Sequence, residues 1–277
     1  MPDKVYIIGA GPGAADLLTL RAANLLRTAH VVLHDDLVPR EILDLCPRSA
    51  DIVNVGKRCG RQGSSQERIN ALMIWYATEP RPLDAHSTEP APERTIVRLK
   101  SGDPSVFGRL GEEMDALRRA GVPFEVVPGV TAAAAAAASA GLTLTDRRSA
   151  SALVLVTAHS TRNQSLERTI FAPERSTYAI YMPGPDYART ARELRDSGLE
   201  SATPCAVVSN AGRANEETRF LTLADLAEAK GIPAPALLIV GEVARQHPPL
   251  RHGDTKAGLS KALPESKTND GGIPLTT

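Results

Sequence analysis

Short apolar runs, many of them β-branched, alternate along the chain with longer segments of helical pattern. In the first half the apolar runs fall at residues 4–8, 31–34, 95–99 and 124–127. Segments with helical pattern separate or follow them at residues 14–28, 65–77, 110–120 and 132–138. Strands that alternate with helices form parallel sheets covered by those helices. The pattern therefore predicts an α/β fold.

The pattern begins again after Gly141. Further strands are predicted at residues 153–157, 177–181, 205–208, 219–221 and 237–240, with helices at 187–197 and 223–230. We therefore predict an N-terminal α/β domain over residues 1–135 and a C-terminal α/β domain over residues 136–246. Residues 247–277 are poor in apolar side chains and are expected to form a disordered tail. The proline-rich residues 78–94 are expected to form a surface excursion.

Capping residues mark several of the predicted helix ends. Ser64 or Ser65 is a suitable N-cap for the helix at 65–77, and Thr131 can cap the alanine-rich segment at 132–138. Gly198 is placed to end the helix at 187–197. These residues support the helix assignments independently of the apolar pattern.

Composition narrows the classes of function. Lys plus Arg and Asp plus Glu number 32 each, so the overall charge gives no argument for nucleic acid or a membrane surface. Cys46, Cys59 and Cys205 are scattered, and their spacing predicts neither disulfides nor a metal site. No apolar run approaches the roughly 18 residues that cross a bilayer. We expect a cytoplasmic, soluble protein that uses no metal and binds neither nucleic acid nor membranes.

A glycine-rich loop follows the first predicted strand. Its residues 9–14 read Gly-Ala-Gly-Pro-Gly-Ala, which formally fits a dinucleotide-binding loop, and Asp35 ends the next strand at a suitable distance. This alone would indicate an NAD- or FAD-dependent oxidoreductase. Pro12 argues against a dinucleotide, because it removes one of the N–H groups that bind pyrophosphate. A plain glycine turn between strand and helix is a third interpretation, and the loop alone leaves all three open.

Seven motifs that follow one another along the chain support a more specific interpretation. They lie at residues 9–13, 34–38, 55–58, 97–104, 106–109 with 111–113, 126–132 and 235–241. Together they resemble the tetrapyrrole methyltransferases, and within them the uroporphyrinogen-III C-methyltransferases of sirohaem, cobalamin and haem d1 synthesis. The resemblance covers roughly residues 4–245. It implies two α/β domains with a cofactor cleft between them, S-adenosylmethionine as co-substrate, and a homodimer.

The resemblance also assigns site residues, motif by motif. It implies cofactor contacts from Pro12, Ser101, Gly102, Asp103, Val106, Thr131, Ala132, Met182 and Ala211. It assigns the reaction to Asp35, Lys57 and Arg109, and substrate binding to Arg109, Glu112 and Met182. Simpler roles stay open for five of these residues. Asp103 fits an Asx-turn before Pro104, Gly102 a plain turn, and Met182 a core position. Asp35 fits a helix cap or a solvated strand end, and Lys57 fits a surface pair with Arg58.

Basic side chains gather around these motifs. Lys57, Arg58 and Arg61 lie in a glycine-containing loop, and Lys100 and Arg109 flank the Gly-Asp turn. The implied substrate is a porphyrinogen with many carboxylates, which such cations would bind. The implied reaction is methylation of uroporphyrinogen III at two pyrrole carbons, giving precorrin-2 through precorrin-1.

Three positions depart from the usual family motifs. Asp36 stands where the family usually has arginine, Ser101 where it has glycine, and Asp146 where it has histidine. These changes leave open a later precorrin C-methyltransferase of the same family. Residues 55–58 and the Thr157-Ala158-His159 sequence favour uroporphyrinogen III. A non-enzymatic α/β binding module is the remaining alternative.

Overall fold

The structure is a computed structural model that describes residues 2–56, 65–80, 93–158 and 175–245. Met1–Arg245 form one compact unit. Several residues and segments considered above lie outside the described residues: Lys57, Arg58, Cys59, Arg61, His159, most of the 78–94 excursion, and the predicted tail at 247–277.

The first sheet has five parallel strands in the order β3-β2-β4-β1-β5. They are β1 (Val5–Gly9), β2 (Val31–His34), β3 (Asp51–Asn54), β4 (Ile96–Lys100) and β5 (Phe124–Val127). The central strands are buried on both faces, as expected for a parallel sheet covered by helices. The predicted parallel α/β fold is confirmed in this part of the chain.

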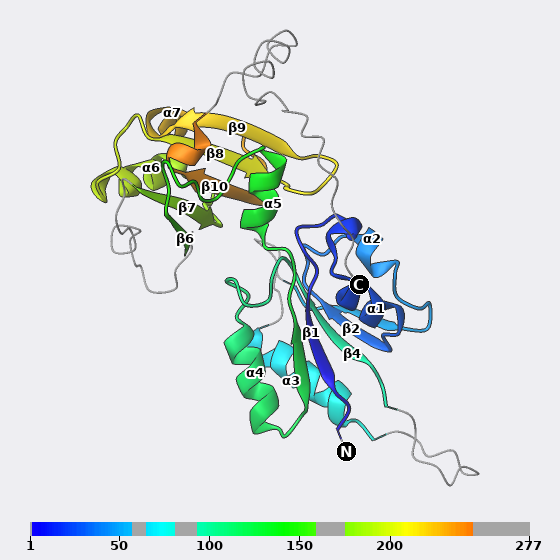
Figure 1. The fold of residues 1–277 in the computed structure, drawn as a ribbon. Coiled ribbons are helices and arrows are strands. Elements are labelled where there is room, and N and C mark those ends of the chain that lie inside the picture. The colour runs from blue at the N-terminus through cyan, green and yellow to red at the C-terminus, as the bar shows by residue number, and fades with distance from the viewer. Residues whose placement is uncertain (1, 57–64, 81–92, 159–174, 246–277) are drawn as a thin grey trace, which may run out of the picture. The chain divides into compact units, whose positions relative to one another are not determined.

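Helices cover both faces of this sheet (Figure 1). On one face, α1 (Leu20–Arg27) and α2 (Arg40–Leu43) pack through Leu26 and Ile42. On the other face, α3 (Gln66–Thr78) and α4 (Leu110–Arg119) pack through Met73 and Leu117. Side chains of a strand alternate between the two faces.

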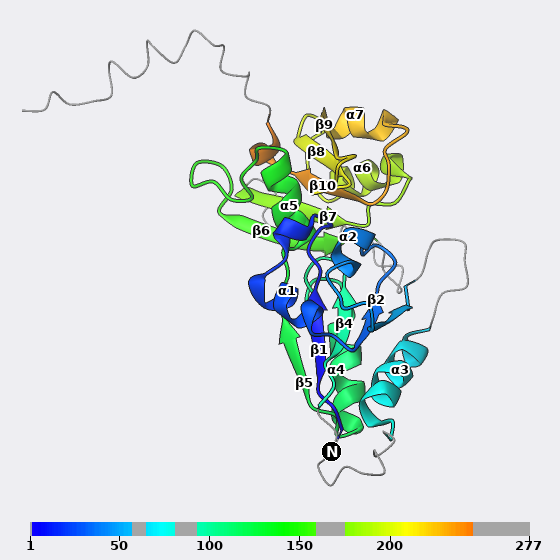
Figure 2. The same cartoon turned by 90° about the vertical axis from the view of Figure 1, so that its right-hand side faces the viewer.

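The second sheet is mixed, with the order β6-β7-β10-β8-β9. Its strands are β6 (Ala152–Thr157), β7 (Ser176–Tyr181), β8 (Pro204–Ser209), β9 (Glu217–Thr222) and β10 (Ala236–Val240). Only β6 and β7 pair in parallel, and the other pairs are antiparallel. Helices α6 (Tyr187–Asp196) and α7 (Leu223–Glu228) cover one face, and α5 (Ala132–Ser139) covers the other (Figure 2).

Some local predictions are wrong. The helix predicted at 14–28 is broken: a short 3-10 turn at Ala15–Leu17 precedes α1, which begins at Leu20 because the Thr19 hydroxyl accepts the N–H of Ala22. Strand β3 and helix α2 were not predicted at all. Thr131 stands at the N-cap position of α5, but its side chain makes no capping hydrogen bond.

Other local predictions are confirmed. Ser65 caps α3 by accepting the N–H of Arg68, and Gly198 follows α6 with a positive φ of 99°. The predicted boundary between residues 135 and 136 falls inside α5 and stays a prediction. Within the described ranges, no helix has the length and apolarity needed to cross a membrane.

Candidate functional site

A cavity of about 490 Å³ is lined by residues that follow strands of both sheets. The loops that follow strands of the first sheet contribute Pro12, Asp35 and Arg109. The loop after β4 also contributes Ser101, Gly102, Asp103, Val106 and Phe107. From α5 and the second sheet come Thr131, Ala132, Tyr181, Met182, Ala211 and Arg213. The volume lies in the range typical of small-molecule sites. Every described residue that the resemblance assigns to the cofactor lines this cavity.

The glycine loop is closed by its own backbone. Ala10 donates its N–H to the carbonyl of Lys100 at 2.7 Å, and Gly11 exchanges two backbone hydrogen bonds with Gly102, at 3.1 and 2.8 Å. A Cβ atom on Gly9 would lie 2.6 Å from both the Gly102 oxygen and the Gly129 nitrogen, so the three chain segments meet where no side chain fits. With these N–H groups engaged and none on Pro12, the loop has little to offer a pyrophosphate.

Asp103 holds the loop after β4. Its Oδ1 accepts the N–H of Ser105 at 2.8 Å and also the Ser105 hydroxyl, which is an Asx-turn. Its Oδ2 accepts the N–H of Gly129 at 3.0 Å. The structural role considered for Asp103 is therefore confirmed. The carboxylate joins two of the segments that surround the cavity.

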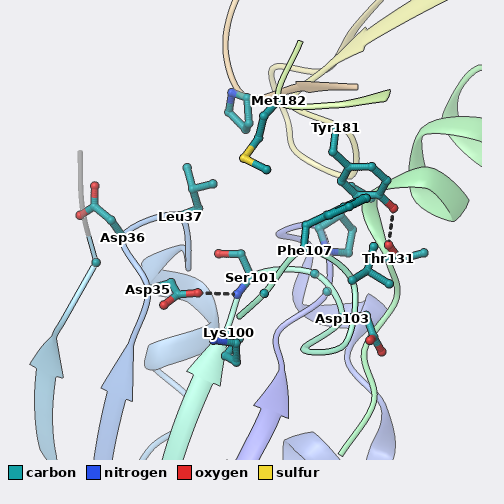
Figure 3. A pocket seen from close by; sticks show the side chains of 18 of the residues that line it. Asp35, Asp36, Leu37, Lys100, Ser101, Asp103, Phe107, Thr131, Tyr181 and Met182 are labelled. Atoms are coloured by element: carbon teal, nitrogen blue, oxygen red, sulfur yellow. Dashed lines mark hydrogen bonds between the residues drawn. The ribbon is translucent and has the colours of Figure 1, made fainter. Parts of the chain in front are cut away.

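Asp35 lies at the end of β2 and points into the cavity (Figure 3). Its Oδ1 forms an ion pair with Arg98, and its Oδ2 accepts the N–H of Ser101 at 3.2 Å. The side chain is 29 % exposed. Asp35 is thus neither a helix cap nor a freely solvated carboxylate, because the chain fixes both of its oxygens.

A group of buried charges lies beneath this part of the cavity. Arg98, Lys100 and Glu113 are all buried, and Glu113 Oε1 accepts from Arg98 Nε at 3.0 Å and from Lys100 Nζ at 2.9 Å. Burial, together with the neighbouring Arg98 guanidinium, lowers the pKa of Lys100 against the opposing effects of Glu113 and Asp35. Lys100 lines the cavity and donates to Glu113, and a role as a substrate-binding cation stays a prediction.

Arg109 stands just before α4, in the left-handed region with φ 54°. Its guanidinium donates two hydrogen bonds to Glu112, at 2.8 and 2.6 Å. This hydrogen bond raises the pKa of Arg109 and lowers that of Glu112. Both side chains are 52 % exposed, and Arg109 lines the cavity, whereas Glu112 is not among its described lining residues.

Tyr181 and Met182 lie across the cavity from Ser101, and Phe107 of the loop after β4 packs against Tyr181 (Figure 3). The rings of Phe107 and Tyr181 lie 4.9 Å apart between centroids. The Tyr181 hydroxyl bonds to the Thr131 hydroxyl and accepts the N–H of Ala133 at 3.2 Å. Phe107 and Met182 both adopt left-handed φ angles, 52° and 50°, and Met182 is 49 % exposed. Met182 is therefore not the core residue that the sequence left possible.

The Ser101 hydroxyl is a buried polar atom with no hydrogen-bond partner among the described residues. Figure 3 shows this side chain turned toward the space between Leu37 and Phe107. Buried hydroxyls usually have a partner, since an unmade hydrogen bond costs about 1–3 kcal/mol. A ligand with a polar group at this position would supply that partner.

Arg213 is a cavity residue that the sequence did not predict. It follows β8 and donates to the carbonyls of Pro12, at 3.3 Å, and Leu37, at 2.6 Å. It therefore connects the glycine loop to the loop after β2. The pattern gave no signal for it, since a single arginine in a turn is usually a surface residue.

These features define an α/β enzyme whose cavity combines an N–H-poor glycine loop, a fixed carboxylate and apolar walls. The family model described as tetrapyrrole (corrin/porphyrin) methylases matches residues 4–227, and the chain belongs to this family. It is therefore a methyltransferase. The resemblance inferred from the motifs is confirmed.

Solved structures and curated proteins agree with this assignment. A uroporphyrin-III C-methyltransferase from Thermus thermophilus in complex with S-adenosylhomocysteine is 38 % identical, with a TM-score of 0.72, and the match covers 87 % of this chain and 99 % of that one. A cobalt precorrin-4 methyltransferase is 29 % identical, with a TM-score of 0.73, over 88 % and 96 %. Siroheme synthase 1 of Cronobacter sakazakii is 43 % identical over 88 % of this chain and 50 % of its own length. The chain thus spans about half the length of the curated relatives it matches.

Proposed function

We propose that the chain transfers methyl groups from S-adenosylmethionine to two pyrrole carbons of uroporphyrinogen III, giving precorrin-2 through precorrin-1. The observation that carries the proposal is that one cavity is lined by every described residue predicted to hold the cofactor, together with Asp35 and Arg109. Similarity to a uroporphyrin-III C-methyltransferase structure that holds S-adenosylhomocysteine supports the choice of co-substrate. Similarity to siroheme synthases supports a place in sirohaem or cobalamin-type synthesis.

The cavity fits a sulfonium cofactor better than a dinucleotide. The residues that would hold it are Pro12, Ser101, Gly102, Asp103, Val106, Thr131, Ala132, Met182 and Ala211. They offer the hydroxyls of Ser101 and Thr131 together with apolar surface, and the N–H groups of the neighbouring Ala10 and Gly11 are already bonded. When bound, S-adenosylmethionine supplies an electrophilic methyl group. The absence of a metal requirement stays a prediction.

The residues of the chain then have separate tasks. Arg109 donates its hydrogen bonds to Glu112, which raises the pKa of the guanidinium, so Arg109 is suited to pair with substrate carboxylates and unsuited to act as a base. Asp35, which lines the cavity, would accept the proton that the macrocycle loses after methylation, with Lys57 assisting. That proton comes from another position of the macrocycle, because the methylated pyrrole carbon is fully substituted. Phe107 and Met182 provide an apolar surface against which a macrocycle can pack. Alignment of the reacting groups in the cavity supplies most of the rate.

A later precorrin C-methyltransferase is the second candidate, favoured by the likeness to a cobalt precorrin-4 methyltransferase. The test is anaerobic incubation with S-adenosylmethionine and either uroporphyrinogen III or a later precorrin, with the products followed by mass. Mono- and dimethylated uroporphyrinogen support the proposal. Methylation of the later precorrin alone would replace the substrate and leave the methyltransferase assignment intact.

We also propose that the enzyme works as a cytoplasmic homodimer, as the resemblance implies. Light scattering coupled to gel filtration measures the mass in solution. A mass of twice 29.4 kDa supports the dimer, and a mass of 29.4 kDa contradicts it.

A further inference from the structure

Two cations stand on the inner face of a central strand. In β4, Arg98 and Lys100 follow Ile96 at alternate positions, so all three point toward α3 and α4. Arg98 is 2 % exposed and Lys100 is 3 % exposed. Burying unpaired charges is costly, so the fold needs anions at this place.

Glu113, in the first turn of α4, is the anion that reaches them. It is fully buried, and its Oε1 accepts from Arg98 Nε, from Lys100 Nζ and, at 3.4 Å, from Gln66 Nε2. Its Oε2 has no hydrogen-bond partner in the described part of the chain. A carboxylate placed only for stability would be expected to have both oxygens satisfied.

All three nitrogens of the Arg98 guanidinium have hydrogen-bond partners. Nε bonds to Glu113, Nη1 donates to the carbonyls of Leu33 and Leu99 at 3.3 and 3.1 Å, and Nη2 pairs with Asp35. A planar guanidinium transmits such constraints because its donors are fixed relative to one another. The position of Glu113 on one side of Arg98 therefore determines where Nη2 meets Asp35 on the other.

Charge balance acts in the same direction. Arg98 and Lys100 are matched by Asp35 and Glu113. Because Lys100 lies next to Arg98, both cations would attract Asp35 if the Glu113 charge were lost. The Asp35 carboxylate would then be drawn away from the cavity.

We infer that Glu113 is a positioning residue for methyl transfer, acting through Arg98 to hold Asp35 in place without touching substrate. The inference rests on the proposed function, in which Asp35 receives a proton. Glu113 belongs to the motif at residues 111–113, which gives it no role, and it does not line the cavity itself. Its hydrogen-bond partners Gln66, Arg98 and Lys100 do line it.

The test compares Glu113→Gln with Asp3→Asn in the full chain. Asp3 is also a buried carboxylate, two residues before β1, and its Oδ2 accepts a hydrogen bond from Arg94 Nε at 3.0 Å. Neither Asp3 nor Arg94 is among the residues that line the cavity. Melting temperature, S-adenosylhomocysteine affinity, kcat and the KM for uroporphyrinogen III are measured for each. Glu113→Gln is expected to lower kcat about 10- to 100-fold, as small misplacements of reacting groups do, with KM and cofactor affinity within threefold of the wild type. Asp3→Asn is expected to lower the melting temperature and leave kcat within twofold.

A Glu113→Gln variant that melts earlier but keeps kcat within twofold would overturn the inference. Should that variant fail to fold, Glu113→Asp keeps the charge but withdraws the carboxylate from Arg98, and it is judged by the same kcat criterion. If the wild-type chain does not methylate uroporphyrinogen III, the proposed function fails separately. The inference is then decided by a crystal structure of Glu113→Gln, where a displaced Asp35 carboxylate supports it and an unmoved one refutes it.

Discussion

Arg109 is held by Glu112, three residues along α4, through two hydrogen bonds to the two carboxylate oxygens. The pair leaves the guanidinium at the cavity but half exposed, where a substrate carboxylate can reach it. Exposed ion pairs contribute little to stability. The pair with Glu112 is therefore better explained as holding the Arg109 guanidinium in place for a substrate carboxylate.

Arg109→Ala is therefore expected to abolish turnover of uroporphyrinogen III while leaving S-adenosylhomocysteine affinity within about twofold. Arg118→Ala is the matched control, because Arg118 makes the equivalent contact with Asp115 on the same helix, away from the cavity. Full activity in Arg109→Ala would remove this residue from the reaction. Calorimetry and mass analysis of the products provide the two measurements.

Asp103→Ala is expected to weaken S-adenosylhomocysteine binding by about 1–3 kcal/mol. The reason is the loss of the hydrogen bonds to Ser105 and Gly129 that shape the cofactor side of the cavity. Ser105→Ala removes only the hydroxyl contact and should weaken binding less. Equal affinity of Asp103→Ala and the wild type in calorimetry would show that the loop keeps its shape without this carboxylate.

Arg213→Ala tests the connection between the glycine loop and the loop after β2. We expect a loss of about 1–3 kcal/mol in the free energy of unfolding and roughly tenfold weaker cofactor binding. Arg219 is the control, since it also donates to two main-chain carbonyls, those of Lys230 and Gly231, outside the cavity. Arg219→Ala should lose comparable stability in urea titrations with no change in affinity. Equal loss of affinity in both variants would contradict a specific role for Arg213.

Burial raises the pKa of the Cys205 thiol to about 12, from an ordinary value of 9.0. The folded state thus holds this proton to higher pH than the unfolded state does. The associated stability is fully present below about pH 9 and is lost as the pH rises toward 12, with a slope of at most about 1.4 kcal/mol per pH unit. Cys205→Val removes the titrating group, so its free energy of unfolding should fall less steeply than that of the wild type above pH 9. Parallel pH curves for the two proteins would contradict this.

The elements with a clear apolar pattern were predicted accurately. The bounds of β2 and β5 match the predicted runs; β2 is fully buried, and β5 is partly buried with Val127 in the core. Strand β3 was missed because its side chains are mostly exposed and only Ile52 and Val53 are apolar. The start of α1 was misplaced because the Thr19 cap, rather than the favourable Ala14 and Ala15, determines where the helix begins.

The candidate site was predictable only where a motif carries it. The resemblance identified cavity residues such as Ser101, Thr131 and Met182 from their neighbours in sequence. Arg213 lies in none of the motifs, and the carbonyl of Pro12 that it contacts is 201 residues away. Glu113 lies in the motif at 111–113, but the motif does not indicate its contact with Arg98, 15 residues earlier. Strand alternation gives the face on which Arg98 lies, but which side chain lies opposite depends on how α4 packs.

The two cations on the inner face of β4 also bear on how this half of the chain folds. Until α4 is in place, Arg98 and Lys100 stay hydrated, and the sheet cannot be closed over them without a large desolvation cost. Docking of α4 and completion of the central strand should therefore occur together, as one cooperative unit. The backbone amides of β4 and α4 would then share a single opening free energy in hydrogen exchange.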